Sequence, residues 1–311
     1  MNLFKLISDL ASTFSSNSTA DGSTVVPGEP SAAPAAHSKN VVPLDDATAA
    51  NACRLSAESG DATAQNQLGE MYCTGRGVTK DLSQAAVWFG KSAEQGNLRG
   101  LCNLGGCYAS GDGLARDPAE GARLYRQAAD GGLAEAQHWL ALAYERGDGV
   151  AQDGAEALTW HRRAAEQGDA WHQLNLAEVL ESGSCGMKDE TEAAKWYRKA
   201  ADQGNEFAQY GLATMYREGR GVAKNPAEAI PLLRRSAASG RPDAALALAT
   251  MYANGEGAPK DPAEAYFWAL PAQWDDKTKN EAEALLGALA KSVTSRQMAK
   301  AKQRLNDLDF G

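Results

Sequence analysis

The chain lacks a long apolar run and an excess of basic residues, and these two absences exclude two classes of partner. No stretch approaches the roughly 20 apolar residues that a helix needs to span a bilayer, so we expect no transmembrane segment. Lys and Arg number 31 against 40 Asp and Glu, a formal net charge of −9. Because nucleic-acid binding needs a basic surface that neutralises phosphates, we expect no nucleic-acid partner.

Cysteine is scarce and irregularly spaced. The chain contains five cysteines, and no two form a C-x-x-C pair, so the sequence offers no zinc-ligand spacing. An odd number without a common interval also argues against a systematic disulfide framework. We therefore interpret the cysteines as packed thiols in a reducing compartment. They are Cys53, Cys73, Cys102, Cys107 and Cys185.

The sequence also has none of the common catalytic motifs. It contains no H-E-x-x-H, no G-x-S-x-G and no G-x-x-x-x-G-K-[ST]. The four histidines are scattered, and His161 occupies a position that holds an aromatic residue elsewhere, so packing explains it. His172 and Cys185 show no metal-ligand spacing. We expect no catalytic, cofactor-binding or metal-ligating residues, and hence a protein that is not an enzyme.

What the chain does have is glycine at a fixed interval. Gly-x-Gly or near-Gly-x-Gly signatures recur every 36 residues, and such a period indicates a stack of similar supersecondary units. A helical pattern precedes each signature, whereas a phosphate-binding loop would need a strand there, so we interpret these glycines as helix ends. The first glycines of the six signatures are Gly75, Gly111, Gly147, Gly183, Gly219 and Gly255.

Each unit predicts two helices. In residues 61–96, a first amphipathic helix carries apolar residues three or four positions apart and ends at Gly75. Asp81 begins a second helix, with Gln84 three residues later in a capping-box arrangement. The corresponding pairs in the other units are Asp117/Glu120, Asp153/Glu156, Asp189/Glu192, Asn225/Glu228 and Asp261/Glu264.

The periodicity predicts three segments. The first is a disordered segment, residues 1–44, because residues 11–44 are rich in Ser, Thr, Ala, Pro and Gly, a composition typical of disorder. Apolar residues at helical spacing within residues 1–10 indicate either a frayed end or a short docking helix. Residues 45–272 carry the repeats and begin with a lone helix of the second type. Residues 273–311 predict two capping helices, over 280–291 and 295–305.

Localisation is inferred from missing signals. The first residues do not contain the apolar core of a signal peptide, and no cysteine precedes Cys53 to serve as a lipoprotein anchor. We therefore expect a cytoplasmic protein. Export by a dedicated secretion system without such a peptide is the alternative.

The unit resembles the Sel-one-like repeat (SLR) family, which consists of tetratricopeptide-like helical repeat proteins. Residues 64–96 show the pattern, "AQNQLGEMYCTGRGVTKDLSQAAVWFGKSAEQG", and the resemblance covers residues 45 to about 272. It implies an all-α fold, an α/α superhelix or solenoid of six 36-residue repeats, and a bacterial source. It also implies a scaffold or adaptor that binds proteins. Some members neutralise toxins, which makes an inhibitor or immunity protein the alternative function.

Departures from the repeat template suggest where a partner binds. Large aromatic residues at positions that are small or polar in other repeats need an explanation other than packing within a repeat. Trp139 stands where other repeats have Gln, Asn, Gly or Ala, and Trp171 and Phe207 stand where others have Thr, Arg, Glu or Asp. His138 and Tyr210 share a neighbouring position. These residues either fill gaps between repeats or line the groove on a concave face.

We therefore predict a non-enzymatic scaffold that binds a protein or peptide on its concave face. Acidic residues on the same helices, Glu178 among them, favour a partner of basic character. Small-molecule binding or hydrolysis is a distant alternative. The predicted partner-binding residues are Trp139, Trp171, Phe207, Tyr210, His138 and Glu178.

Repeat four departs most from the template. Cys185 replaces the second glycine of the signature, Leu180 replaces a recurring tyrosine, and His172 replaces a small residue. Because glycine adopts the left-handed backbone geometry easily, its loss predicts a changed loop. The change is either neutral drift or a local bend that shapes the groove.

Overall fold

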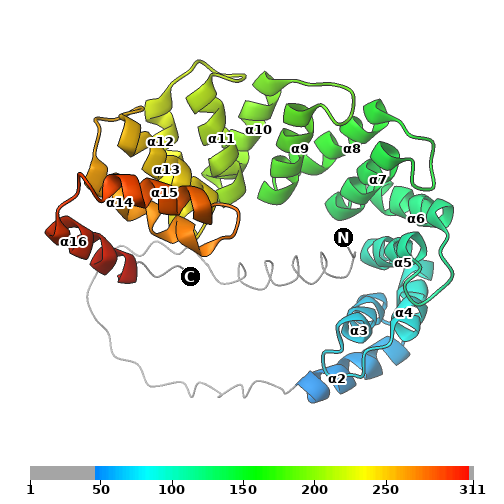
Figure 1. The fold of residues 1–311 in the computed structure, drawn as a ribbon. Coiled ribbons are helices and arrows are strands. Elements are labelled where there is room, and N and C mark those ends of the chain that lie inside the picture. Colours follow the sequence, from blue (N-terminus) through cyan, green and yellow to red (C-terminus); the bar gives the residue numbers. More distant parts are fainter. Residues whose placement is uncertain (1–45, 308–311) are drawn as a thin grey trace, which may run out of the picture. The chain divides into compact units, whose positions relative to one another are not determined.

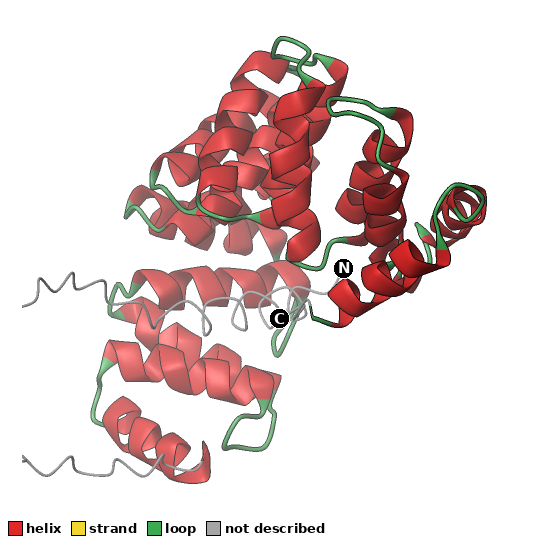
Figure 2. Ribbon diagram, turned by 90° about the vertical axis from the view of Figure 1, so that its left-hand side faces the viewer, coloured by secondary structure: helices red, strands yellow, loops and turns green. Residues whose placement is uncertain are grey.

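The computed structural model describes residues 46–307, and all regular elements in this range are helices (Figures 1 and 2). Helices α2 to α6, and helices α8 to α14, each pack against the next helix in sequence, and the fold is an all-α solenoid. The docking helix predicted in residues 1–10 lies outside the described residues.

Each 36-residue repeat forms two helices, as predicted. The first helices are α3 (Ala62–Thr74), α5 (Leu98–Ser110), α7 (Ala134–Arg146), α9 (Ala170–Ser182), α11 (Glu206–Glu218) and α13 (Pro242–Asn254). The second helices are α4 (Leu82–Glu94), α6 (Pro118–Asp130), α8 (Gly154–Glu166), α10 (Glu190–Asp202), α12 (Pro226–Ala238) and α14 (Pro262–Ala269). Before them lies α2 (Asp46–Glu58), and after them η1 (Pro271–Trp274), α15 (Lys279–Leu289) and α16 (Ser295–Asn306).

The chain divides into two compact units. The described residues of the first run to Ala136 and include Asp148–Val150, and the second comprises Gln137–Gly147 and the chain from Ala151 onward. The two helices predicted near the C-terminus are present as α15 and α16. The predicted segment boundaries, at residues 44/45 and 272/273, stay predictions.

The recurring glutamines of the repeat motif hydrogen-bond to each other. The amide of Gln203, at the end of α10, donates to the side chain of Gln173 in α9 over 2.8 Å. Gln95 donates to Gln65 in the same way over 2.7 Å. With Gln167 and Gln137, these pairs tie the end of the second helix to the beginning of the first helix in repeats one, three and four. Polar groups at such buried positions need partners.

The capping Asp residues behave only partly as predicted. The side chain of Asp81 accepts the backbone N–H of Gln84, as in a capping box. The reciprocal bond does not form there, because the backbone N–H of Asp81 donates to the carbonyl of Tyr72 in the preceding helix, over 3.0 Å. The same bond, from Asp261 to Tyr252 in repeat six for example, closes the glycine loop of each repeat. Asn225 makes no side-chain cap bond at all.

The first and second glycines of a signature have different structural roles. The first ends its helix in a left-handed conformation, as Gly219 does at φ +81°. The second lies against the preceding repeat: a Cβ on Gly221 would stand 2.0 Å from the carbonyl oxygen of Glu190, at the beginning of α10. Glycine at the second position is therefore required by backbone-to-backbone contact between repeats as well as by its positive φ.

Repeat four exchanges this glycine for one on the facing helix. A Cβ on Gly154, the first residue of α8, would stand 2.3 Å from the carbonyl oxygen of Cys185. The loop geometry changes as predicted: Cys185 has no positive φ, and Gly186 takes it instead at +78°. In repeats three and six, the residue that faces the second glycine is a proline, Pro118 or Pro226. The loop and the facing helix thus approach each other closely in repeat four as well, but the glycine is on the helix and not in the loop.

This exchange predicts strong coupling between the two positions. Gly154→Pro alone should destabilise the protein by about 2 kcal/mol, because its side chain overlaps the Cys185 carbonyl. Adding Cys185→Gly restores the pairing of the other repeats, and the double variant should regain most of that loss. Urea denaturation of the four proteins in the cycle measures the coupling. Additive effects of the two substitutions would contradict the exchange.

Candidate functional site

The predicted partner-binding residues lie in the second unit, on the first helices of repeats three to five. Phe207 and Tyr210 project from α11, Trp171 and Glu178 from α9, and Trp139 from α7. Phe207 is 49% exposed, Glu178 is exposed, and the others are partly buried. We call the surface formed by these five residues the first-helix face.

Three of the five residues share a pocket. Phe207, Tyr210 and Glu178 line a cavity of about 550 Å³ between α9 and α11. The volume falls within the roughly 300–1,000 Å³ typical of ligand sites. Its other lining residues are Glu181, Ser182, Tyr197, Gly211, Thr214 and Arg241.

Arg241 closes one side of the pocket, and the residue set predicted from sequence does not include it. Its guanidinium lies 4.0 Å from the centre of the Phe207 ring and 5.3 Å from that of Tyr210, which is cation–π geometry. It also pairs with Asp243, with Nε 3.0 Å from Oδ1. Arg241 stands at the N-cap position of α13, where Asp61 and Asn205 cap other first helices. The comparison with the repeat template could therefore have found it.

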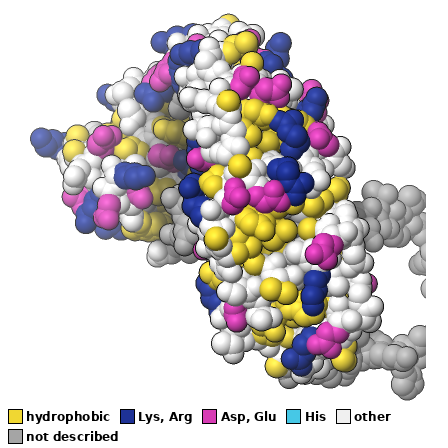
Figure 3. Space-filling view, turned by 90° about the vertical axis from the view of Figure 1, so that its right-hand side faces the viewer, with side chains coloured by type: hydrophobic (Ala, Val, Ile, Leu, Met, Phe, Trp, Pro, Cys, Tyr) yellow, Lys and Arg dark blue, Asp and Glu magenta, His cyan; other side chains and the backbone are white. Residues whose placement is uncertain are grey.

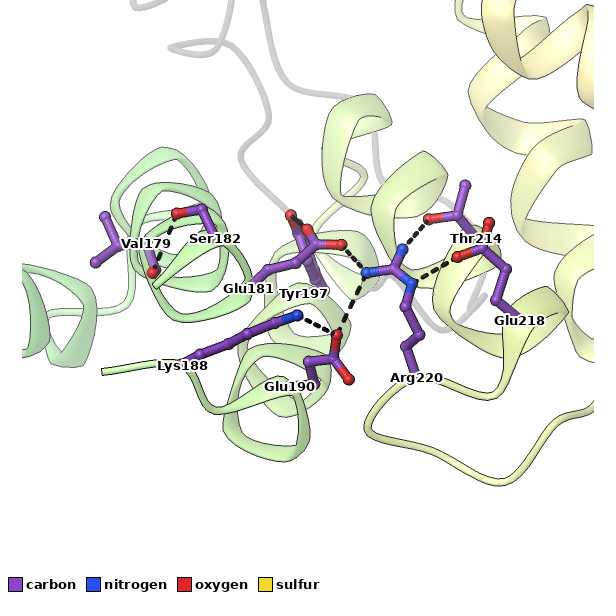
Figure 4. A network of polar contacts seen from close by, with 9 residues as sticks. All are labelled: Val179, Glu181, Ser182, Lys188, Glu190, Tyr197, Thr214, Glu218 and Arg220. Atoms are coloured by element: carbon purple, nitrogen blue, oxygen red, sulfur yellow. Dashed lines mark hydrogen bonds and ion pairs between the residues drawn. The ribbon is translucent and has the colours of Figure 1, made fainter. Parts of the chain in front are cut away.

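A polar network supports the floor of the pocket (Figure 4). The Tyr197 hydroxyl donates to Glu181 over 2.5 Å, and Arg220 pairs with the other oxygen of the same carboxylate. Arg220 lies in the glycine loop of repeat five and also pairs with Glu218. The hydrogen bond to Glu181, together with burial, raises the pKa of Tyr197. This network fixes the position of Glu181 and offsets its charge.

Trp139 and Trp171 belong to a second group, an aromatic and histidine cluster. The ring of His138 lies 4.5 Å from Trp171 and 5.5 Å from Trp139, measured between centroids in edge-to-face geometry. His161 and His172 complete the cluster, with centroids 5.5 Å and 6.0 Å from His138. The structure thus brings the predicted aromatic residues together in two groups, one at the pocket and one around His138.

His138 requires a correction. The repeat comparison places it at the surface beside Tyr210, whereas the structure buries it to 4% exposure. The equivalent residues Asn66, Cys102 and Leu174 are buried as well, and only Tyr210 remains partly exposed. A residue buried to this degree offers almost no surface to a partner, and its ring instead packs against Trp139 and Trp171.

Burial favours the neutral form of two imidazoles of the cluster, His161 and His138. His161 is 2% exposed, as the packing interpretation predicts, and burial lowers its pKa to about 4. Burial also lowers the pKa of His138 well below its ordinary value, and the neighbouring His161 adds to this. His138 Nδ1, His161 Nε2 and His172 Nε2 make no hydrogen bond within residues 46–307. Only His172 Nδ1 has an acidic partner, Asp169, at 3.1 Å.

Two other features are absent from the described part of the chain. It contains no group of three or more His, Cys, Asp or Glu side chains arranged to hold a metal. Within the same residues, no helix has the length and apolarity to cross a membrane. All five cysteines are free thiols, and four of them are buried, in agreement with the packing interpretation.

Exposed apolar side chains are not confined to the first-helix face. On the face seen in Figure 3, hydrophobic side chains are interrupted by Lys, Arg, Asp and Glu. Of the large hydrophobic residues that are exposed in the described range, Phe207 alone lies on a first helix. The others are Leu55, Val87, Met187 and Trp274.

Comparison with known proteins identifies the family. The Sel1 repeat model matches six consecutive segments, residues 62–97, 98–133, 134–169, 173–205, 207–240 and 242–272. The chain belongs to the Sel1 repeat family. No curated protein shows significant similarity to it.

Two solved Sel1-type structures resemble the chain. One is c5321, a protective antigen of uropathogenic Escherichia coli with an SLR fold, at 34% identity and a TM-score of 0.70. The match covers 83% of this chain and 55% of c5321, so the chain spans about half the length of that protein. The other is a Sel1 repeat protein from Oxalobacter formigenes, at 28% identity and a TM-score of 0.58, covering 75% of this chain and 98% of that one.

Membership gives a coarse statement of function. Sel1 repeat proteins are generally scaffolds for protein interaction, and the fold is typically non-enzymatic. The neighbours make a bacterial source plausible. The function of this chain beyond that level has to be argued from its own residues.

Proposed function

We propose that this Sel1 repeat protein binds a partner protein or peptide on the concave side of its repeats, through the first-helix face. The observation that carries the proposal is the pocket between α9 and α11, where Phe207 and Tyr210 stand beside the carboxylate of Glu178. In the other repeats, the residues equivalent to Phe207 are not aromatic, apart from Trp171.

The chemistry of this face suits an interface. Aromatic side chains bury a large area at a small cost in rotamer entropy, and they dominate binding energy at many interfaces. Phe207 is half exposed, yet its ring is held against Arg241. Because the helices are already formed, binding would require little ordering of the backbone.

Removing two aromatic residues of the pocket should weaken binding while leaving the fold intact. We expect Phe207→Ala combined with Tyr210→Ala to weaken partner capture at least about tenfold, because each interface aromatic commonly contributes more than 1 kcal/mol. Affinity capture from the source organism, quantified by mass spectrometry against the unmodified protein, measures the loss. The melting temperature of the double variant should stay within a few degrees.

Val87→Ala provides the matched control. Val87 is a 50% exposed apolar residue on α4, a second helix. Its truncation removes exposed apolar surface away from the first-helix face and should leave capture unchanged. A double variant that retains every partner, or a Val87→Ala variant that loses them, would refute the proposal.

A further inference from the structure

The charges around the pocket pair off and leave one carboxylate without a partner. Arg241 is neutralised by Asp243, and Glu181 by Arg220. Glu178 makes no hydrogen bond or ion pair with any other residue of the described range. Arg220 is shared between Glu181 and Glu218, so the lining keeps a negative balance. Of the charged groups that line the cavity in the described residues, Glu178 alone has no ion pair.

The surroundings make this charge costly. The protein around Glu178 raises the pKa of its carboxyl by desolvation, the nearby Glu181 raises it further, and Arg241 opposes them. The side chain is nevertheless exposed, so a ligand can reach it. A cation that entered the pocket would offset both destabilising influences at once.

The hydroxyl groups of the pocket are oriented to accept hydrogen bonds. Thr214 donates its hydroxyl hydrogen to the Gly211 carbonyl over 2.7 Å, and Ser182 donates to the Val179 carbonyl over 3.3 Å. Figure 4 shows the Ser182 bond and the position of Thr214 beside Arg220. Each oxygen already accepts one hydrogen bond, Thr214 from Arg220 over 3.5 Å and Ser182 from the Ser184 N–H over 3.3 Å. Each has one lone pair left, so toward the pocket these oxygens can only accept. The Tyr197 hydroxyl likewise donates its hydrogen to Glu181.

The walls and the floor therefore complement an elongated cation. Phe207 and Tyr210 offer apolar surface for a methylene chain, and Glu178, Thr214 and Ser182 line the same cavity with oxygens that can accept from its charged end. Long basic side chains have this construction, an aliphatic stem with several donors at its tip. An anionic ligand would meet Glu178, and the guanidinium of Arg241 is already occupied by Asp243.

We propose that this pocket receives a lysine or arginine side chain of the partner polypeptide, with the stem on Phe207 and Tyr210 and the charged end at Glu178. The inference rests on the proposed function, because it names the chemistry of one contact in that interface. It commits to a basic residue of a protein, not to a free polyamine or an anion.

Four small probes test the pocket without a known partner. They are the N-acetyl methylamides of lysine, arginine, norleucine and citrulline, of which the last two are neutral counterparts of similar shape. Binding is followed by chemical-shift changes of the Gly211 and Thr214 amides in the full chain. We expect saturable shifts with the lysine and arginine probes. The neutral probes should bind at least about fivefold more weakly, because they lose a charge-assisted hydrogen bond.

Glu178→Gln should weaken the two cationic probes about tenfold and leave norleucine unchanged. The control is Glu166→Gln, which removes the same charge from an exposed position outside the pocket and should change no affinity. Equal binding of charged and neutral probes, or full binding by Glu178→Gln, would overturn the inference. So would the absence of any shift with the cationic probes.

The two experiments distinguish failure of the pocket contact from failure of the proposed function. If the probes do not bind but the double aromatic variant still loses its partners, the face is an interface and the basic-side-chain contact is wrong. If the double variant keeps its partners, the interface itself is wrong, whatever the probes do.

Discussion

Replacing Gly221 by alanine should lower the melting temperature by roughly 6–12 °C, from about 3 kcal/mol of destabilisation at about 2–4 °C per kcal/mol in a protein of this size. Two costs add. A side chain at φ +64° is strained by about 1–2 kcal/mol. In addition, the new Cβ would stand 2.0 Å from the Glu190 carbonyl oxygen, so α10 and the loop must separate at a further cost of about 1–3 kcal/mol.

Gly204→Ala separates the two costs. Gly204 also has a positive φ, +92°, but a Cβ there would meet nothing within 4 Å. Its substitution should therefore cost only the backbone strain, roughly a third to a half of the Gly221→Ala effect. Thermal unfolding followed by circular dichroism compares the two. Equal shifts would mean that the contact between repeats contributes nothing.

Acidification should destabilise the second unit through its buried histidines. The folded-state pKa of His161 is about 4, whereas an unfolded histidine titrates near 6.5. Between these values the unfolded chain binds a proton that the folded chain does not, so stability falls as pH falls. Linkage gives a loss of about 2 kcal/mol from His161 alone between about pH 7 and pH 5. His138, whose pKa is lowered too, adds to the loss.

The groups that face these imidazoles define the variant to test. The charge of Glu145 raises the pKa of His161 and so opposes the effect of burial. The charge of Arg146 lowers the pKa of His138 further. Of the three imidazoles, the Asp169 carboxylate bonds only to that of His172. His161→Phe places at this position the residue that Phe89 provides in repeat one. The melting temperature of the wild type should fall between pH 7 and pH 5. In the variant this fall should be smaller by roughly 4–8 °C.

Carboxylates elsewhere titrate equally in both proteins, so the difference between wild type and His161→Phe isolates the imidazole. An unchanged pH dependence would show that His161 becomes protonated in the folded protein without cost. A larger dependence in the variant would reverse the sign of the argument.

Local features of the fold were predictable from sequence because each has a short-range cause. The 36-residue period, the ends of the first helices at glycine and the beginnings of the second helices at Asp81 or Asp261 all follow from preferences within a few residues. The capping boxes were overestimated because the backbone N–H of each capping residue is already used by the preceding helix. That bond depends on the loop conformation, which the capping pattern does not encode.

The candidate site was predictable only in part. Phe207, Tyr210 and Glu178 depart from the template, and the structure places them in one pocket. His138 departs equally, but whether its position is buried depends on the neighbouring repeats. The pairing of Arg220 with Glu181 joins residues 39 positions apart, so no local pattern reveals that Glu178 is left unpaired. The compartment in which the chain acts stays a prediction.

Photo-crosslinking from single positions tests the central claim most directly. A benzophenone amino acid at position 207 lies on the first-helix face, and the same residue at position 87 lies on α4, a second helix, with similar exposure. Irradiation in the source organism should give a discrete covalent adduct with a partner polypeptide from position 207 and none from position 87. An adduct from position 87 alone, or none from position 207 while a partner still co-purifies, would contradict the assignment of the first-helix face as the interface.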